Sequence, residues 1–177
     1  AELHANLAES HQRRDDVLGA AEHYRSACAL RPQWADAWNN LGLCLRALGE
    51  ALAAIAAFEE ALRVQPAHAR AAYNLGNAHY DNGDKTAAQQ AFACACAIAP
   101  QNAEAHYGLG TTASEPARAI AHLSRALALR ADFPQAALAA RQMENKGSVV
   151  AFEIEAWVPG VLPGRSVRSG SIGLARA

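Results

Sequence analysis

Residues 38–66 read WNNLGLCLRALGEALAAIAAFEEALRVQP. Apolar side chains recur at spacings of three and four up to Leu45 and again from Ala54, as they do along one face of an α-helix. Gly49 separates the two series and favours the left-handed conformation that ends a helix. Pro66 blocks continuation of the second series, because proline lacks the N–H that a helix interior needs. The stretch therefore predicts two helices joined by a tight turn.

The same pattern returns every 34 residues along the chain. A fixed period of this length indicates a solenoid, in which each unit is a helical hairpin that buries its apolar face against its neighbours. The aligned positions are Leu7, Leu41, Leu75 and Leu109; Ala8, Gly42, Gly76 and Gly110; Ala20, Ala54 and Ala88; Tyr24, Phe58 and Phe92; Ala27, Ala61 and Ala95; and Pro32, Pro66 and Pro100.

The units are 1–34, 35–68, 69–102 and 103–133. The fourth lacks three residues around Thr112–Pro116, about one helical turn, and Ala131 stands where proline is expected. Pro134 suits the first turn of one more helix. We expect that helix over 133–145, as a cap on the last apolar face. The repeat domain is thus predicted to span residues 1–146.

Small residues mark the place where the two helices of a unit cross. Gly42 lets the two backbones approach, and Ala54 meets it from the second helix. A large side chain at such a crossing would overpack it, at a cost of roughly 1–3 kcal/mol. Phe58 is then expected to fill the wedge toward the next unit.

This pattern resembles the tetratricopeptide repeat, whose spacing is W-x2-L-G-x2-Y followed by A-x3-F and P within 34 residues. Trp38, Leu41–Gly42, Ala54, Phe58 and Pro66 match that spacing, and the resemblance covers residues 1 to about 133. The departures are Ala8 and Asp15 in place of glycine, His11 and His79 in place of tyrosine, and Ala131 in place of proline.

The resemblance implies an all-α fold, a right-handed superhelical α-solenoid of helix-turn-helix repeats with a C-terminal capping helix. It also implies an interaction scaffold or adaptor that binds a peptide or partner segment in a concave groove. Similar repeats precede the catalytic domains of some bacterial glycosyltransferases and sulfotransferases. The alternative is therefore a substrate-recruiting fragment of a larger bacterial enzyme. A third interpretation is a structural protein that polymerises by repeat stacking.

The groove implied by the resemblance is lined by the first helix of each unit. Asparagine amides there both donate and accept hydrogen bonds, so they suit a peptide backbone, although they can also cap local backbone. Tyrosine is enriched among the side chains that dominate interface energetics. Glu9 would repel a C-terminal carboxylate, so that mode of peptide binding is not expected. The candidate groove residues are Asn6, Asn39, Asn40, Leu43, Arg70, Tyr73, Asn74, Asn77, Tyr80 and Tyr107.

The composition changes after Lys146. Residues 147–177 are rich in glycine and carry no repeat register, and apolar and polar residues alternate over 149–158 as in a strand. One interpretation is a flexible or non-native tail. The other is a segment, Val150–Val158, that lies along the groove of its own chain or of a neighbour, which would permit self-association.

Motifs that suggest chemistry have structural explanations here. Gly108-x-Gly110-x-x-Ala113 matches a loose dinucleotide fingerprint, but it is in register with the repeat glycines and follows no strand. Cys94 and Cys96 would point in different directions on a helix, so they do not suit one ion. The seven histidines form no H-x-x-x-H or H-E-x-x-H motif. We therefore expect no catalytic residue, no metal and no cofactor.

Charge and composition narrow the remaining classes. Sixteen basic and seventeen acidic residues give a net charge of −1, which disfavours a nucleic-acid surface. No apolar run approaches the roughly 18 residues of a membrane span. Four cysteines make no disulfide framework in a chain of 177 residues, which favours a reducing, cytoplasmic setting. The excess of alanine and of arginine over lysine hints at a bacterial gene.

Overall fold

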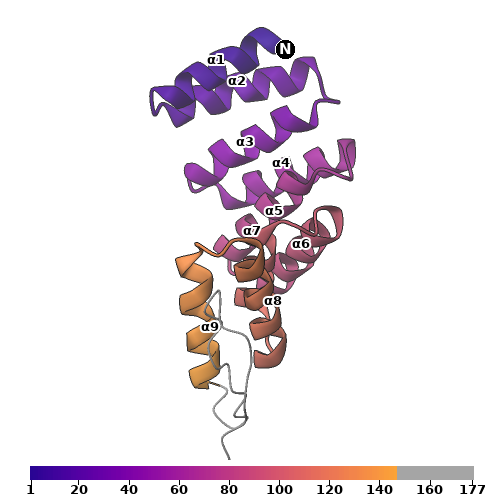
Figure 1. Cartoon of the computed structure of the whole chain (residues 1–177). Helices are drawn as coiled ribbons and strands as arrows, with labels where there is room; N and C mark the ends of the chain where they lie inside the picture. Colours follow the sequence, from indigo (N-terminus) through magenta and orange to yellow (C-terminus); the bar gives the residue numbers. More distant parts are fainter. Residues whose placement is uncertain (147–177) are drawn as a thin grey trace, which may run out of the picture. The chain divides into compact units, whose positions relative to one another are not determined.

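The computed structural model describes residues 1–146, and this part of the chain contains nine α-helices (Figure 1). The predicted strand-like segment at 149–158, and the rest of 147–177, lie outside the described residues. The helices are α1 (Glu2–Arg13), α2 (Val17–Leu30), α3 (Ala35–Ala47), α4 (Ala51–Val64), α5 (Ala69–Asp81), α6 (Lys85–Ile98), α7 (Ala103–Thr112), α8 (Pro116–Leu129) and α9 (Pro134–Lys146).

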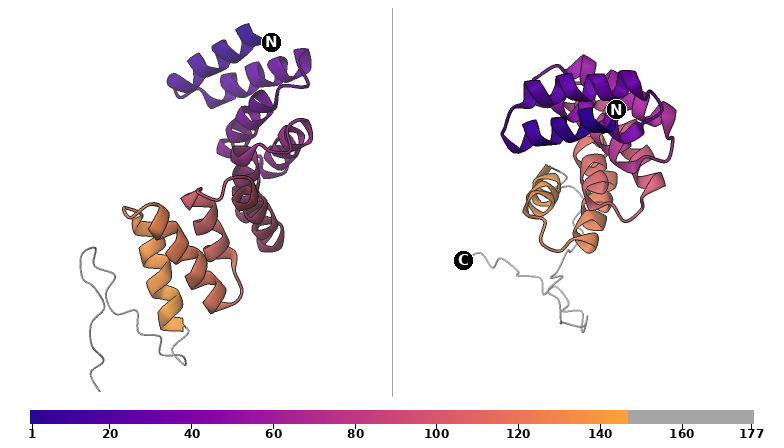
Figure 2. Two further views of the ribbon diagram at one scale, coloured as in Figure 1. Left: turned by 45° about the vertical axis from the view of Figure 1, so that its right-hand side comes forward. Right: turned by 90° about the horizontal axis from the view of Figure 1, so that it is seen from above.

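The helices pack in chain order. The two helices of each pair pack against each other, and the second helix of a pair packs against the first helix of the next pair (Figures 1 and 2). First helices of neighbouring pairs also touch, α3 with α5 and α5 with α7. The prediction of an all-α solenoid of helix pairs is confirmed. None of the helices within residues 1–146 is long and apolar enough to cross a membrane.

In the second, third and fourth pairs, the helix crossing is built around a glycine of the first helix: Gly42, Gly76 or Gly110. A Cβ added to Gly42 would lie 2.6 Å from Cε1 of Phe58, and one added to Gly76 would lie 2.5 Å from Cδ1 of Phe92. Real Cβ atoms do not approach carbon that closely, so a side chain there would displace the ring. Close approach at the small residues is as predicted, but the nearest side chain to Gly42 is Phe58 and not Ala54, so the aromatic ring lies directly beneath the first helix of its own pair.

The turns within the first three pairs use a left-handed residue. Gly49 and Gly83 have φ values of 79° and 85°, and Asp15 takes the equivalent place with a φ of 62°. Glycine adopts this conformation without a steric penalty, whereas aspartate has a Cβ that crowds the backbone. The turn of the first pair therefore carries backbone strain that the next two turns do not.

The capping helix α9 packs against α8. Phe133 and Ala136 are buried at this junction, together with Leu123 and Ala126 of α8. Among residues 1–146 no further helix covers the opposite end of the stack: Leu3 of α1 is 70% exposed, whereas Ala37, its equivalent one repeat later, is 2% exposed.

Candidate functional site

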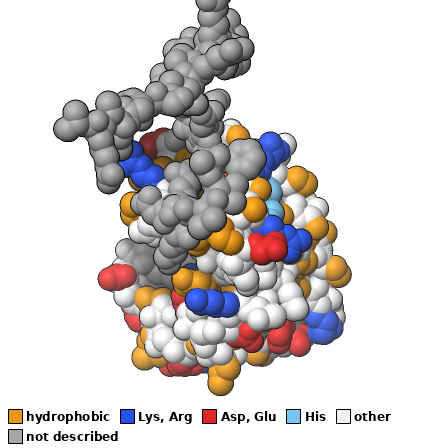
Figure 3. Space-filling view, turned by 90° about the horizontal axis from the view of Figure 1, so that it is seen from below, with side chains coloured by type: hydrophobic (Ala, Val, Ile, Leu, Met, Phe, Trp, Pro, Cys, Tyr) orange, Lys and Arg blue, Asp and Glu red, His pale blue; other side chains and the backbone are white. Residues whose placement is uncertain are grey.

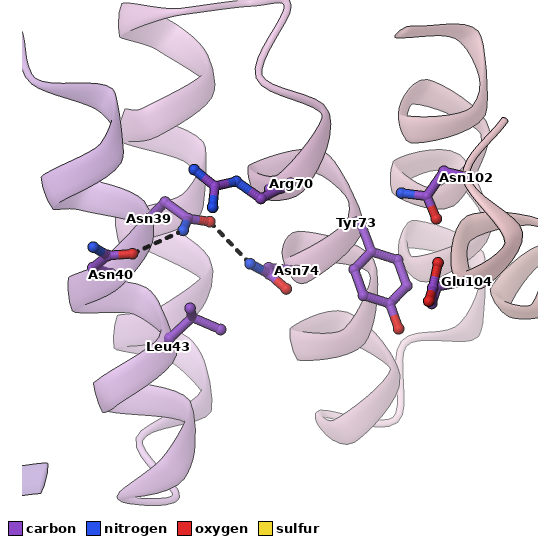
Figure 4. A pocket seen from close by; sticks show the side chains of 8 residues that line it. All are labelled: Asn39, Asn40, Leu43, Arg70, Tyr73, Asn74, Asn102 and Glu104. Atoms are coloured by element: carbon purple, nitrogen blue, oxygen red, sulfur yellow. Dashed lines mark hydrogen bonds between the residues drawn. The ribbon is translucent and has the colours of Figure 1, made fainter. Parts of the chain in front are cut away.

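A pocket of about 360 Å³ opens across the first helices of the second, third and fourth pairs (Figure 4). Residues of α3 line one wall, residues of α5 the middle, and the start of α7 the other wall. Its lining combines carboxamides, one tyrosine, one leucine and two charged side chains. The lining residues are Asn39, Asn40, Leu43, Arg70, Tyr73, Asn74, Asn102 and Glu104.

Three asparagines form a hydrogen-bonded chain along one side of the pocket. Asn74 Nδ2 donates to Asn39 Oδ1 at 2.9 Å, and Asn39 Nδ2 donates to Asn40 Oδ1 at 3.2 Å (Figure 4). Asn39 is only 2% exposed, so its amide orients its neighbours, while Asn40 and Asn74 are partly exposed. Each side-chain amide carries two N–H groups and two acceptor lone pairs, so the outer amides keep capacity for a ligand.

The chain of hydrogen bonds continues out of the pocket into the first helix pair. Asn40 Nδ2 donates to the Tyr24 hydroxyl at 3.3 Å, and that hydroxyl donates to Gln12 Oε1 at 3.2 Å. Gln12 Nε2 in turn lies 3.4 Å from Cys44 Sγ. Burial raises the pKa of the Tyr24 hydroxyl, so it stays protonated at neutral pH and keeps its donor role. The orientation of Asn40 is therefore fixed from α1 and α2.

Charged side chains at the pocket rim are held in ion pairs. Arg70 is 75% exposed, and its Nη2 donates to Asp36 Oδ1 at 3.0 Å. Buried His68 shares this carboxylate: its Nδ1 accepts from the Ala71 N–H, which leaves Nε2–H to donate to Asp36 at 3.1 Å. Glu104 is paired with Arg130. On the described surface in Figure 3, acidic and basic side chains are interspersed with apolar ones.

Tyrosines extend the site along α5 and α7. The Tyr73 ring lies 5.8 Å from the Phe92 ring, and the Tyr107 ring lies 5.1 Å from the Phe133 ring, measured between ring centres. Burial, with neighbouring Tyr80 and Tyr73, raises the pKa of the Tyr107 hydroxyl. Core aromatic rings therefore hold Tyr73 and Tyr107 in place, while Tyr80 is 46% exposed.

The pocket unites many of the candidate groove residues. Asn39, Asn40, Leu43, Arg70, Tyr73 and Asn74 line it, whereas Asn6, Asn77, Tyr80 and Tyr107 lie outside its lining. Two lining residues were not predicted. Asn102 caps α7 by accepting the Ala105 N–H at 2.9 Å, and Glu104 follows Arg70 by one repeat of 34 residues. The repeat register contained the signal for Glu104, because Asp36, Arg70 and Glu104 occupy one row.

The glycine and cysteine motifs of the sequence lie at regular positions of the repeat helices. Gly108 and Gly110 lie inside α7, where a Cβ would collide with Phe92 or Leu123, respectively. Cys28, Cys44, Cys94 and Cys96 are all free thiols, and burial raises the pKa of Cys28 to about 12. Within residues 1–146 no group of three or more histidine, cysteine or acidic side chains is arranged to hold a metal ion.

Solved structures with similar folds include MamA, with a TM-score of 0.77 and 21% identity over 84% of this chain and 82% of MamA. PilF of Pseudomonas aeruginosa has a TM-score of 0.74 and 22% identity over 84% of this chain and 69% of PilF. The first tetratricopeptide domain of Spaghetti (RPAP3), solved with the HSP90 peptide SRMEEVD, has a TM-score of 0.62 and 16% identity over 63% of this chain and 91% of that one. At these identities the likeness concerns the fold.

Sequence comparison identifies the family. No curated protein matches the chain. The family model described as tetratricopeptide repeat matches residues 5–61 and 45–103, which together span more than half of the sequence. Domains of this kind generally serve protein–protein interaction. The chain belongs to the tetratricopeptide repeat family.

Proposed function

We propose that the chain is an interaction module that binds an extended peptide segment of a partner protein across α3, α5 and α7, and that it acts by binding and not by catalysis. The observation that carries the proposal is the pocket in which Asn40, Asn74 and Tyr73 lie side by side on neighbouring first helices (Figure 4). An extended peptide presents N–H and C=O groups at regular intervals, and carboxamides satisfy both kinds.

The hydrogen-bonded asparagine chain supports binding through pre-organisation. Because Asn39 and Tyr24 already hold the outer amides, little side-chain freedom is lost when a ligand arrives. Leu43 and the Tyr73 ring add apolar contact area within the same pocket. Rim charges are paired, so we expect contacts with the peptide backbone to matter more than charge attraction. Affinity on the order of micromolar corresponds to about −8 kcal/mol.

A peptide-library selection on the immobilised full chain tests the proposal. Peptides that bind are then measured by fluorescence anisotropy against Tyr73→Ala, Asn74→Ala and the control Leu52→Ala, whose side chain is 73% exposed on α4. We expect a loss of about 1–2 kcal/mol for Tyr73→Ala, or roughly 5- to 30-fold, and unchanged binding for the control. Selected peptides that bind all variants alike would place the site elsewhere and contradict the proposal.

The chain also contains a candidate occupant for its own groove. We propose Val150–Val158, whose apolar alternation suits an extended segment, as a competitor for the same pocket within one chain or between two. Truncation after Lys146 is then expected to tighten binding of the selected peptides or to reduce self-association in sedimentation. Unchanged values of both would reject this occupant without affecting the peptide proposal. The four free thiols favour a reducing, cytoplasmic setting for either interaction.

A further inference from the structure

Two histidine pairs occupy the same place in the first and the last helix pair. His4 of α1 faces His23 of α2, and His106 of α7 faces His122 of α8. The two pairs have equivalent positions in the repeat, because the fourth unit lacks three residues between its two histidines.

The middle units show that this place does not need histidine. The second unit has Trp38 and Ala57 at the two positions, and the third has Ala72 and Ala91. Packing of the two helices is therefore satisfied by apolar side chains of quite different size. Where one histidine occurs at this place, however, its partner position is also histidine, in both units. The paired occurrence indicates that the two imidazoles interact with each other.

The distances within both pairs suit a shared metal ion. The two Nδ1 atoms are 3.3 Å apart in His4/His23 and 3.4 Å apart in His106/His122. A tetrahedral ion with metal–nitrogen bonds of about 2.0–2.1 Å holds two nitrogens about 3.3 Å apart. An N–H···N hydrogen bond between the two rings also fits this distance, so metal titration has to separate the two. In both pairs it is the same ring atom that points at its partner.

In His106, Nε2 makes a hydrogen bond on the side away from His122, and this leaves Nδ1 available to bind a metal ion. His106 Nε2 lies 3.3 Å from the Pro100 carbonyl oxygen, which can only accept, so Nε2 carries the proton. Trp38 Nε1 donates in the same way to Pro32, at 2.9 Å. In the neutral ring this leaves Nδ1 of His106 as the acceptor nitrogen, and a histidine that donates its other N–H to a carbonyl is the usual arrangement of a metal ligand.

The surroundings of the two pairs differ in charge. The His11 ring lies 5.1 Å from the His23 ring, and its Nδ1 is 2.7 Å from Asp16 Oδ2. The Gly19 N–H and His11 hold the pKa of Asp16 below its usual value, so a carboxylate charge lies near the first pair. At the second pair, burial lowers the pKa of His122, and the neighbouring His106 and Arg118 lower it further. Glu115, 3.7 Å from Arg118, offsets that charge in part.

We propose that His4/His23 and His106/His122 are two binding sites for a divalent transition-metal ion of the kind that imidazole prefers, Zn²⁺ or Ni²⁺. Each ion takes two Nδ1 ligands from the protein, and water completes its coordination. The ion then clips the two helices of the first and of the last pair together. The nearby carboxylate makes His4/His23 the tighter site, and Arg118 makes His106/His122 the weaker one.

Isothermal titration of NiCl₂ and of ZnCl₂ into the untagged full chain at pH 7.5 tests the two sites. The variants His23→Ala and His122→Ala restore the alanine of the middle units, so they keep a side chain that the fold already accepts. We expect two ions per wild-type chain, one in each single variant and none in the double variant. His79→Ala and Cys94→Ser are controls outside both pairs, and they should bind as the wild type does.

A second measurement separates metal binding from a packing role. Added Ni²⁺ should raise the thermal midpoint of the wild type but not that of the double variant, because a ligand stabilises only the state that binds it. Binding should also weaken sharply from pH 7.5 to pH 5.5, as the imidazoles take up protons. Absence of binding to the wild type would overturn the proposal, as would equal binding to the double variant.

Discussion

The second and fourth helix pairs are built on the same crossing but differ in length. In the second pair Gly42 of α3 lies over Phe58, and in the fourth pair Gly110 of α7 lies over Leu123, where a Cβ would approach Cγ to 2.6 Å. Helix α3 has 13 residues, whereas α7 has 10. The three missing residues have thus been taken from the end of the first helix, after its glycine.

This difference shows which part of a unit is constrained. In both pairs a glycine lies above a large buried side chain, and the crossing survives a change from phenylalanine to leucine. The end of the first helix can lose a helical turn without shifting that contact. The crossing therefore depends on the residues around the glycine, and the end of the first helix is the tolerant part of the unit.

Removing the buried side chain of each crossing should have the largest effect. Phe58 and Leu123 are both 0% exposed. Phe58→Ala is expected to lower the free energy of unfolding by about 3–5 kcal/mol, and Leu123→Ala by about 2–5 kcal/mol. Urea denaturation followed by circular dichroism measures both, with exposed Leu52→Ala as the control. A smaller loss for Phe58→Ala than for Leu123→Ala would reverse our ranking of the two crossings.

A methyl group at a crossing tests how closely the helices must approach. Gly76→Ala places a Cβ 2.5 Å from the Phe92 ring, and Phe92 also meets Gly108 of α7, so the ring has little room to move. Overpacking costs about 1–3 kcal/mol, and alanine recovers up to about 1 kcal/mol of helix propensity. We expect a net loss of about 1–2 kcal/mol in urea denaturation.

The double variant Gly76→Ala/Phe92→Leu sharpens this test, because leucine already occupies the fourth crossing. Its loss should be smaller than the sum of the two single losses. Additive losses would mean that the Cβ and the ring do not collide.

The turns provide a test with the opposite sign. Asp15 adopts the left-handed conformation that Gly49 and Gly83 adopt in the next two pairs. Asp15→Gly should remove the steric penalty and raise the free energy of unfolding by about 0.5–1 kcal/mol. The reverse change, Gly49→Asp, should lower it. Thermal unfolding measures both, and a decrease for Asp15→Gly would show that the aspartate side chain stabilises its turn.

Restoring the missing length should have the smallest effect. Three residues inserted after Ala113 lengthen the turn between α7 and α8 and should change the free energy of unfolding by about 0.6 kcal/mol or less. The same insertion between Asn39 and Asn40 would rotate Leu41 and Gly42 by about 300° relative to the start of α3, since each residue turns a helix by about 100°. Similar stability of the two insertion variants would refute the proposed difference between the crossing and the end of the first helix.

The repeat register predicts the helices and crossings because each depends on a residue that few others can replace. Gly42 and Gly76 must be small, and Phe58 and Phe92 must fill the space that these glycines leave. The same register places Asn40 and Asn74 on neighbouring first helices. These two pocket residues could therefore be predicted from the sequence.

Other features of the pocket depend on side-chain orientation, which the repeat pattern does not encode. Gln12 occupies the position of Arg46 and Tyr80, so no repeated residue type marks it as a hydrogen-bond partner. The burial of Asn39 follows from how α3 and α5 approach. The histidine pairs join helices across separations of 19 and 16 residues, and the shortened fourth unit hides their equivalence.

Because of the hydrogen bonds from Gln12 through Tyr24 to Asn40, residues outside the pocket help to orient a side chain that lines it. Separation of α1 from α2 would remove Gln12 from the Tyr24 hydroxyl and so weaken the support of Asn40. Neither helix contributes a side chain to the pocket lining. Ligand affinity would then depend on whether α1 and α2 stay packed together, because their separation would leave the Asn40 amide less ordered.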